Sequence, residues 1–144
     1  MKKQNLQKIN EIILDGTMVP FGRIGAFAAK KAIQGNKVII LNSEKMIIIG
    51  NPKKIIEKRL NRIALGKGNP RKPIFPRETI PFIKRSIRGM LNYDKTTGRN
   101  AFKRIMCYEG IPKEFEGKDS IKLTKKTPLN YINIRELTKI LMQK

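Results

Sequence analysis

Residues 78–91 read ETIPFIKRSIRGML, and this stretch is expected to organise the fold. Its apolar side chains recur at three- and four-residue intervals, so they share one face of an amphipathic helix. Thr79 is expected to cap this helix, and Pro81 suits its first turn. The apolar face consists of Ile80, Ile83, Ile87, Met90 and Leu91. Because the other side carries Lys84, Arg85 and Arg88, we expect the apolar side to dock on a core and the cationic side to bind phosphate groups.

The residues that follow this helix extend the same unit. A short basic loop occupies residues 93–99, and a second helix is expected over 99–104. The apolar run 105–108 predicts a strand, and Gly110-Ile111-Pro112 predicts a turn after it.

The residues before the helix predict a βαβ unit. Short apolar strands are expected at 11–15 and 38–41, and the alanine-rich stretch 21–34 between them has a helical pattern. Such a unit implies parallel strands joined by a right-handed crossover. A third buried strand is expected at 46–49, and Asn51-Pro52 then opens another helix with its cap and first-turn proline in preferred places. The chain therefore predicts a small α/β core.

The charge of the chain indicates a polyanionic partner. Its 144 residues include 32 lysines and arginines but only 11 acidic residues, which gives a formal net charge of +21 and a pI near 10.5. This excess is far more than solubility requires, and its self-repulsion opposes compaction. The hydrophobic content of 40% still supplies a modest core, so the chain is expected to fold as one domain with a tail.

Residue types that carry chemistry are scarce. The chain has one cysteine, Cys107, and no histidine, which argues against disulfide frameworks and zinc sites. Cys107 lies in an apolar strand, where it is expected to be a small buried hydrophobe, as in a reducing compartment. Residues 1–10 lack the apolar stretch of a signal peptide, and the runs 38–41 and 46–49 are too short to span a bilayer. We expect no metal, no cofactor and no small-molecule substrate.

The basic residues gather in one part of the sequence. Residues 53–104 hold half of the lysines and arginines and only three carboxylates, Glu57, Glu78 and Asp94. This asymmetry predicts a continuous binding surface, on which affinity would fall steeply with salt. The candidate nucleic-acid-binding residues are Lys54, Lys58, Arg62, Lys67, Arg71, Lys72, Arg77, Lys84, Arg85, Arg88, Lys95, Arg99, Lys103 and Arg104.

The composition favours folded RNA over DNA as the partner. No helix-turn-helix, zinc-finger or zipper pattern is visible, and the aromatic content of 6% argues against base stacking as the main device. The loop 66–77 contains three prolines and two glycines among basic residues, and a loop of this kind inside a small domain is usually functional. A cationic surface that recognises shape therefore fits the sequence best.

Two other classes of function have weaker support in the sequence. An enzyme would use the three glycines in 16–25 and Asp15, which ends a strand where α/β active sites lie. However, the GxGxxG pattern is absent, Gly66-Lys67-Gly68 lacks the Walker spacing, and no histidine is available for acid–base catalysis. A membrane-surface protein would use the helix that carries Lys54, whose apolar face the core already needs.

Several motifs form a recognisable set between residues 12 and 112. They are, in chain order, Leu14-Asp15-Gly16, Phe21-Gly22-Arg23-Ile24-Gly25, Gly68-Asn69-Pro70-Arg71-Lys72-Pro73, Phe75-Pro76-Arg77, Arg88-Gly89-Met90-Leu91, Gly98-Arg99-Asn100-Ala101 and Tyr108-Glu109-Gly110-Ile111-Pro112. Together they resemble the universal L-thirteen family of large-subunit ribosomal proteins, in its archaeal and eukaryotic branch.

The resemblance implies an α/β fold with three α/β/α layers and a mostly parallel four-stranded sheet. It also implies a non-catalytic protein of the cytoplasmic ribosome, without a cofactor, that binds large-subunit ribosomal RNA beside neighbouring ribosomal proteins and supports subunit assembly. The family's binding surface carries over onto Arg71, Lys72, Arg77, Arg85, Arg88 and Arg99. The residues alone reach only an RNA-binding α/β domain, so a non-ribosomal RNA-binding or RNA-modifying protein stays the alternative.

The C-terminal part of the chain is expected to be an extension. We assign residues 1–112 to the RNA-binding α/β domain and residues 113–144 to this extension, in which 113–127 is charged and irregular. Asn133 is expected to cap a last helix over 134–142, which would dock on the body through its isoleucines and leucines.

Overall fold

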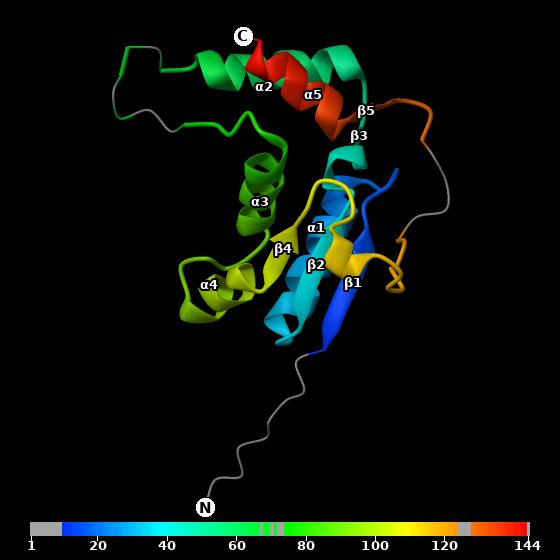
Figure 1. Cartoon of the computed structure of the whole chain (residues 1–144). Coiled ribbons are helices and arrows are strands. Elements are labelled where there is room, and N and C mark those ends of the chain that lie inside the picture. Colours follow the sequence, from blue (N-terminus) through cyan, green and yellow to red (C-terminus); the bar gives the residue numbers. More distant parts are fainter. Residues whose placement is uncertain (1–9, 67, 70, 72–73, 124–127, 144) are drawn as a thin grey trace, which may run out of the picture.

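The computed structural model describes residues 10–66, 68–69, 71, 74–123 and 128–143 (Figure 1). A parallel sheet lies at its centre, formed by β1 (Glu11–Asp15), β2 (Lys37–Leu41) and β4 (Ile105–Cys107) in the order β1-β2-β4. The helix α1 (Phe21–Ile33) connects β1 to β2. The predicted βαβ unit and the α/β class are therefore confirmed.

The parallel sheet has three strands, which corrects the expectation of four. The strand β3 (Ile47–Ile49) pairs antiparallel with β5 (Tyr131–Asn133) in a separate two-stranded sheet. The cause is the 3-10 turn η1 (Ser43–Lys45), which begins after Asn42 adopts a left-handed conformation with φ of 51°. This turn takes the chain away from the parallel sheet at the carboxyl edge of β2, so the third aliphatic run finds a different partner.

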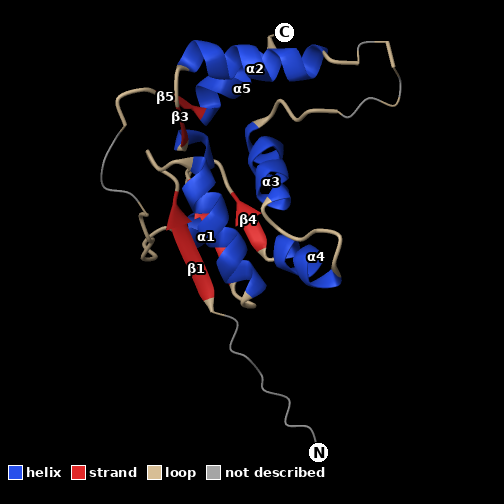
Figure 2. Cartoon of the chain, turned by 180° about the vertical axis from the view of Figure 1, so that it is seen from behind, coloured by secondary structure: helices blue, strands red, loops and turns tan. Residues whose placement is uncertain are grey.

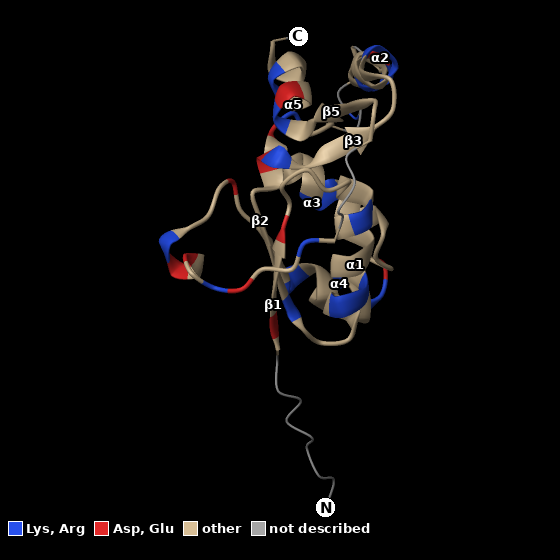
Figure 3. Cartoon of the chain, turned by 90° about the vertical axis from the view of Figure 1, so that its right-hand side faces the viewer, with Lys and Arg blue, Asp and Glu red and all other residues tan. Residues whose placement is uncertain are grey.

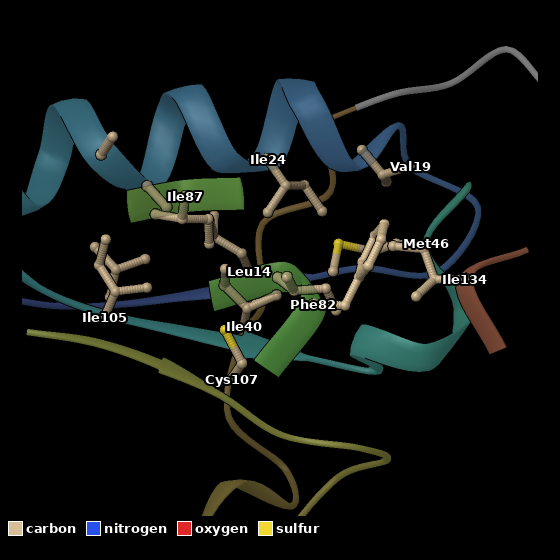
Figure 4. Close-up of a cluster of buried hydrophobic side chains, with 14 of the residues drawn as sticks. Leu14, Val19, Ile24, Ile40, Met46, Phe82, Ile87, Ile105, Cys107 and Ile134 are labelled. Carbon is tan, nitrogen blue, oxygen red and sulfur yellow. The ribbon is translucent and has the colours of Figure 1, made fainter. Parts of the chain in front are cut away.

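One face of the parallel sheet carries the main core. The helices α1, α3 (Thr79–Gly89) and α4 (Thr96–Lys103) pack together on this face, and Figure 2 shows α1 in front of the strands and running alongside them. In Figure 4, Leu14 and Ile40 from the sheet lie next to Ile24 of α1 and Ile87 of α3. All four side chains are at most 1% exposed, so the βαβ unit and α3 share one apolar interior.

The helix α3 has the expected amphipathic character, with two differences. Ile83, Ile87 and Leu91 are buried as expected, but Phe82 is buried as well and Met90 is 39% exposed. Thr79 does not cap the helix, because Glu78 holds the cap position and the Thr79 hydroxyl lies 3.4 Å from that of Thr138. The buried face is therefore shifted toward Phe82, whose ring lies 6.3 Å from that of Phe21.

The helix α4 begins at Thr96, earlier than the sequence pattern indicates. Thr97-Gly98 has the composition of a turn, but Gly98 lies inside the helix and is buried. A Cβ atom at this position would collide with the carbonyl group of Asn92, so glycine serves a close backbone approach here.

The other face of the parallel sheet is covered by a short segment after residue 112, in place of the second helical layer that the expected α/β/α arrangement required. The 3-10 turn η2 (Lys113–Phe115) places Phe115 against Ile13, Ile39 and Leu41. Farther along, Ile121 donates its N–H to the carbonyl oxygen of Ile13 at 2.9 Å, and so binds the outer edge of β1.

The end of the chain completes the core from above the carboxyl edge of the sheet. The helix α5 (Ile134–Met142) has the bounds that the sequence predicts, and it packs beside α2 (Pro52–Ala64) (Figure 1). The preceding Asn133 makes no side-chain capping hydrogen bond. The main core includes four side chains from this region, Ile132, Ile134, Leu137 and Leu141. The division of the chain at residue 112 stays a prediction.

Candidate nucleic-acid interface

Three cations on α3 each lie over an aromatic ring from another segment. The Lys84 Nζ atom lies 5.2 Å from the ring centre of Phe102, and the Arg85 Cζ atom lies 5.1 Å from that of Phe75. The Arg88 Cζ atom lies 4.8 Å from the ring centre of Tyr93. We call Lys84, Arg85 and Arg88 the α3 cation row.

The rings hold the α3 cation row in place while its charge stays available. Arg85 and Arg88 are exposed, and Arg85 also donates a hydrogen bond from Nη1 to the carbonyl oxygen of Ile74. A cation held over a ring keeps its donors free for phosphate oxygens. The row borders a shallow groove lined by Ile74, Pro76, Pro81, Lys84, Arg85, Arg88, Tyr93 and Phe102. This arrangement presents three fixed positive charges along one apolar groove.

The cations around α4 fall into two groups. Lys95, Arg99 and Lys103 are exposed, and Arg99 is anchored by a 3.1 Å hydrogen bond from its Nε to the carbonyl oxygen of Tyr93. Arg104, in contrast, donates from Nη1 to the carbonyl oxygen of Ala32 at 3.1 Å and is partly buried. Arg99 therefore lies beside the ring that holds Arg88, whereas Arg104 ties the end of α4 to α1.

The cations of α2 lie on a helix that is covered on one side only. Lys54, Lys58 and Arg62 are exposed as expected. Sequence reasoning missed Arg59, whose Cζ atom lies 4.9 Å from the ring centre of Phe82. Its position three residues before Arg62 was the available signal, because that spacing places both side chains on one face of a helix. Burial, together with the charge of Arg62, lowers the pKa of Arg59.

The basic loop is described in part. Arg71 and Arg77 are exposed, and the backbone N–H of Arg71 donates to the Asn69 Oδ1 atom at 2.9 Å. Lys67 and Lys72 lie outside the described residues.

Carboxylates are sparse around these cations. Within the described residues, the ion pairs join Glu11 to Lys37 at 3.0 Å and to Lys118 at 3.5 Å, and neither involves a candidate binding residue. Figure 3 shows lysine and arginine on α2, α3 and α4, while acidic residues recur on the segment around η2. Among the described residues, the candidate cations of these three helices therefore make no ion pair with a carboxylate.

Asp15 has a structural role at the carboxyl edge of β1. Its Oδ1 atom accepts hydrogen bonds from the Thr17 backbone at 3.0 Å, the Thr17 hydroxyl at 2.7 Å and the Asn42 amide at 3.0 Å. Burial opposes ionisation of Asp15, but these hydrogen bonds outweigh it and lower the pKa. A carboxylate held ionised by three donors closes the turn and is poorly suited to acid–base catalysis.

Other sites of chemistry are limited in the part of the chain that the structure describes. Cys107 is buried as expected, and burial raises the pKa of its thiol to about 11. No cluster of three or more potential metal ligands occurs among the described residues. None of the described helices is both long enough and apolar enough to span a membrane.

Comparison with known proteins agrees with the resemblance seen in the motifs. Residues 10–114 match the family described as Ribosomal protein L13. The large ribosomal subunit protein uL13 of Methanosphaera stadtmanae is 34% identical over 128 residues, which cover 87% of this chain and 90% of that protein. The protein of the same name from Methanocaldococcus jannaschii is 36% identical over 130 residues, with 88% and 94% covered. For Haloarcula marismortui the identity is 29% over 133 residues, with 91% and 90% covered. The match spans the parallel sheet and the α3 cation row alike, and the chain belongs to the ribosomal protein L13 family.

Proposed function

We propose that this chain is a structural constituent of the large ribosomal subunit and binds large-subunit ribosomal RNA through the α3 cation row and the cations beside it. The role is non-catalytic, its place is the ribosome in the cytoplasm, and it includes support of subunit assembly. Membership of the L13 family supports this role, as does the formal net charge of +21.

The α3 cation row is the observation that carries the proposal. Its charges are set in position by Phe102, Phe75 and Tyr93 before any partner arrives, so binding costs little ordering of these side chains. Each phosphate that they neutralise releases condensed counterions, which favours association. Arg99, Arg71 and Arg77 extend this surface on the α4 and loop sides.

The proposal also assigns parts of the chain to different contacts. Residues 1–112 form the RNA-binding part, and residues 113–144 form an extension whose last helix completes the core. Neighbouring ribosomal proteins are further partners in this proposal.

Filter binding of the full chain to a transcript of large-subunit ribosomal RNA tests the proposal. The logarithm of the association constant should fall linearly with the logarithm of the salt concentration, with a slope of about −0.7 to −0.9 for each phosphate contacted. A small-subunit ribosomal RNA of similar length is the control. Equal affinity for both RNAs would show that large-subunit RNA is not the specific partner. An association constant that does not change with salt would show that the chain does not contact phosphates.

A further inference from the structure

A cavity of about 210 Å³ lies between α2, α3 and the segment that contains Phe75 and Pro76. Its lining includes Arg59, Arg62, Phe75, Phe82, Arg85, Ser86 and Gly89. The cavity adjoins the α3 cation row, because Arg85 lines both this cavity and the groove beside the row. We call it the arginine cavity.

The arginine cavity combines apolar walls with an uncompensated positive rim. Two of its three arginines are placed by rings that also line it, Arg59 over Phe82 and Arg85 over Phe75. None of the described residues that line the cavity is acidic, and the ion pairs of the described chain lie elsewhere, at Glu11. Burial lowers the pKa of Arg59, and the nearby charge of Arg62 lowers it further. The cavity therefore suits a ligand that carries a planar or apolar group for the walls and a negative charge for the arginines.

The size of the cavity narrows the choice of ligand. Pockets for drug-sized molecules measure roughly 300–1,000 Å³, so this cavity suits one smaller group. Unstacked RNA bases commonly lie against aromatic rings or guanidinium planes, and their phosphates pair with arginine. An RNA strand that follows the α3 cation row reaches the cavity at Arg85 without leaving the cationic surface.

We propose that the arginine cavity receives a single unstacked nucleotide, with its base against the apolar walls and its phosphate on the arginine rim. This inference rests on the proposed RNA-binding function and adds a base-binding site to a surface otherwise built for phosphates. An acidic aromatic side chain of a partner protein is the competing occupant, and the experiment below distinguishes the two.

The test is an NMR titration of the isotopically labelled full chain with AMP, UMP, ribose 5-phosphate and the dipeptide Asp-Phe. AMP or UMP should shift the amide signals of residues around Ser86 and Gly89, and should bind about tenfold more tightly than ribose 5-phosphate, because only the nucleotides bring a base. Equal affinities for nucleotide and ribose 5-phosphate would overturn the base site. Tighter binding of Asp-Phe than of either nucleotide would overturn it in favour of a protein partner.

Two substitutions locate the binding in the cavity. Gly89→Phe adds a ring at a residue of the cavity lining, where a Cβ atom meets no atom within 4 Å, and should weaken nucleotide binding about tenfold or more. Gly22→Phe is the matched control, because a Cβ atom at Gly22 also meets no atom within 4 Å and the residue lies on α1. Arg62→Glu removes a rim cation from an exposed position and should weaken binding likewise, whereas Arg135→Glu changes an exposed arginine of α5 that lies outside the lining and belongs to no group of candidate binding residues. Unchanged nucleotide affinity in both Gly89→Phe and Arg62→Glu would contradict the assignment.

Binding of the large-subunit RNA transcript to the same proteins separates the two proposals. If the wild-type chain binds the transcript but neither nucleotide, the base site is wrong and the ribosomal function stands. If the wild-type chain fails to bind the transcript, the proposed function itself is wrong.

Discussion

Arg88 is an exposed arginine whose position is set by an aromatic ring and not by a carboxylate. Its Cζ atom lies 4.8 Å from the ring centre of Tyr93, and Arg99 donates to the carbonyl oxygen of the same tyrosine. A single residue, Tyr93, thus organises two of the cations that are proposed to bind RNA. Cations placed in this way contribute little to stability, since an exposed cation–π contact is worth about 0.5–1 kcal/mol.

We predict that Arg88→Ala weakens binding to large-subunit RNA without unfolding the chain. One lost phosphate contact should lower the affinity for RNA about tenfold. It should also reduce the slope of affinity against salt concentration by the contribution of about one phosphate. The free energy of unfolding should fall by less than about 1 kcal/mol, because only the contact with Tyr93 is lost. Filter binding and chemical denaturation measure the two effects.

The exposed arginine Arg135 on α5 provides the control for this substitution. It belongs to none of the groups of candidate binding residues, so Arg135→Ala should change RNA affinity less than Arg88→Ala does. If both variants lose the same affinity, the binding depends on net charge alone, and the α3 cation row has no special role.

Cys107 gives the stability a defined dependence on pH. Burial raises the pKa of its thiol from 9.0 to about 11, with a smaller opposing effect from the charge of Lys84. At pH below 9.0 the thiol is protonated in both the folded and the unfolded chain, so its full contribution to stability is present. Between pH 9.0 and about 11 the unfolded chain loses this proton first, and the free energy of unfolding falls.

We therefore predict that the wild-type chain loses more stability over this pH range than Cys107→Ala does. Lysine and tyrosine side chains titrate in the same range in both proteins, so the difference between the two denaturation series isolates the thiol. Parallel pH dependences would show that Cys107 does not stay protonated in the folded chain.

At the scale of elements, α3 connects the core to the proposed RNA surface. Phe82, Ile83 and Ile87 are buried on one side of the helix, and the α3 cation row lies on the other. The spacing of the apolar residues predicts the burial of Ile83 and Ile87, because helical periodicity is a local property of the sequence, but it does not predict the burial of Phe82. The rings of Phe75 and Phe102 could not be assigned to their cations in the same way, since tertiary packing brings those separate segments to α3.

The facing of α3 is tested by Ile83→Ala. Ile83 is 1% exposed, so truncation should lower the free energy of unfolding by about 2–5 kcal/mol while leaving the cations unchanged. Ile33→Ala is the matched control, because Ile33 is 56% exposed on α1 and should cost far less. Urea denaturation of both variants decides the matter, and a neutral result for Ile83→Ala would mean that the helix faces the core differently.

The strands show where sequence reasoning reaches its limit. The run 46–49 predicts a buried strand, and β3 does form at Ile47–Ile49, but only Ile47 of its three residues is buried and Ile49 is exposed. Its partner β5 has three residues and lies immediately before α5. Such a short strand carries too little alternation to be recognised, and the pairing depends on the turn η1 and on the docking of α5. Only tertiary structure reveals that β3 leaves the parallel sheet.

The sequence predicts only some of the candidate binding residues, because tertiary structure decides where each basic side chain lies. Counting charges along the sequence finds Arg88 and Arg99, which are exposed and anchored, but it also includes Arg104, which donates to the carbonyl oxygen of Ala32. It omits Arg59, which lines the arginine cavity. A count registers charge but not the direction in which a side chain points.

At the scale of the whole molecule, a small core supports a large excess of positive charge. The last helix α5 adds Ile134, Leu137 and Leu141 to that core, so both ends of the described chain contribute to one interior. The formal net charge of +21 works against this compact state, because like charges repel one another. Neutralisation by RNA phosphates would relieve that repulsion, so the charge and the proposed partner belong together.

Sedimentation of a tagged copy of the chain in cell lysate, at moderate and then at high salt, tests the central claim most directly. We predict that the tagged chain travels with the large ribosomal subunit and stays there at high salt, because in the assembled subunit its phosphate contacts would be shielded from the salt that weakens binding of the isolated chain to free RNA. A chain that stays near the top of the gradient, or leaves the subunit at modest salt, would contradict a structural role in the large subunit.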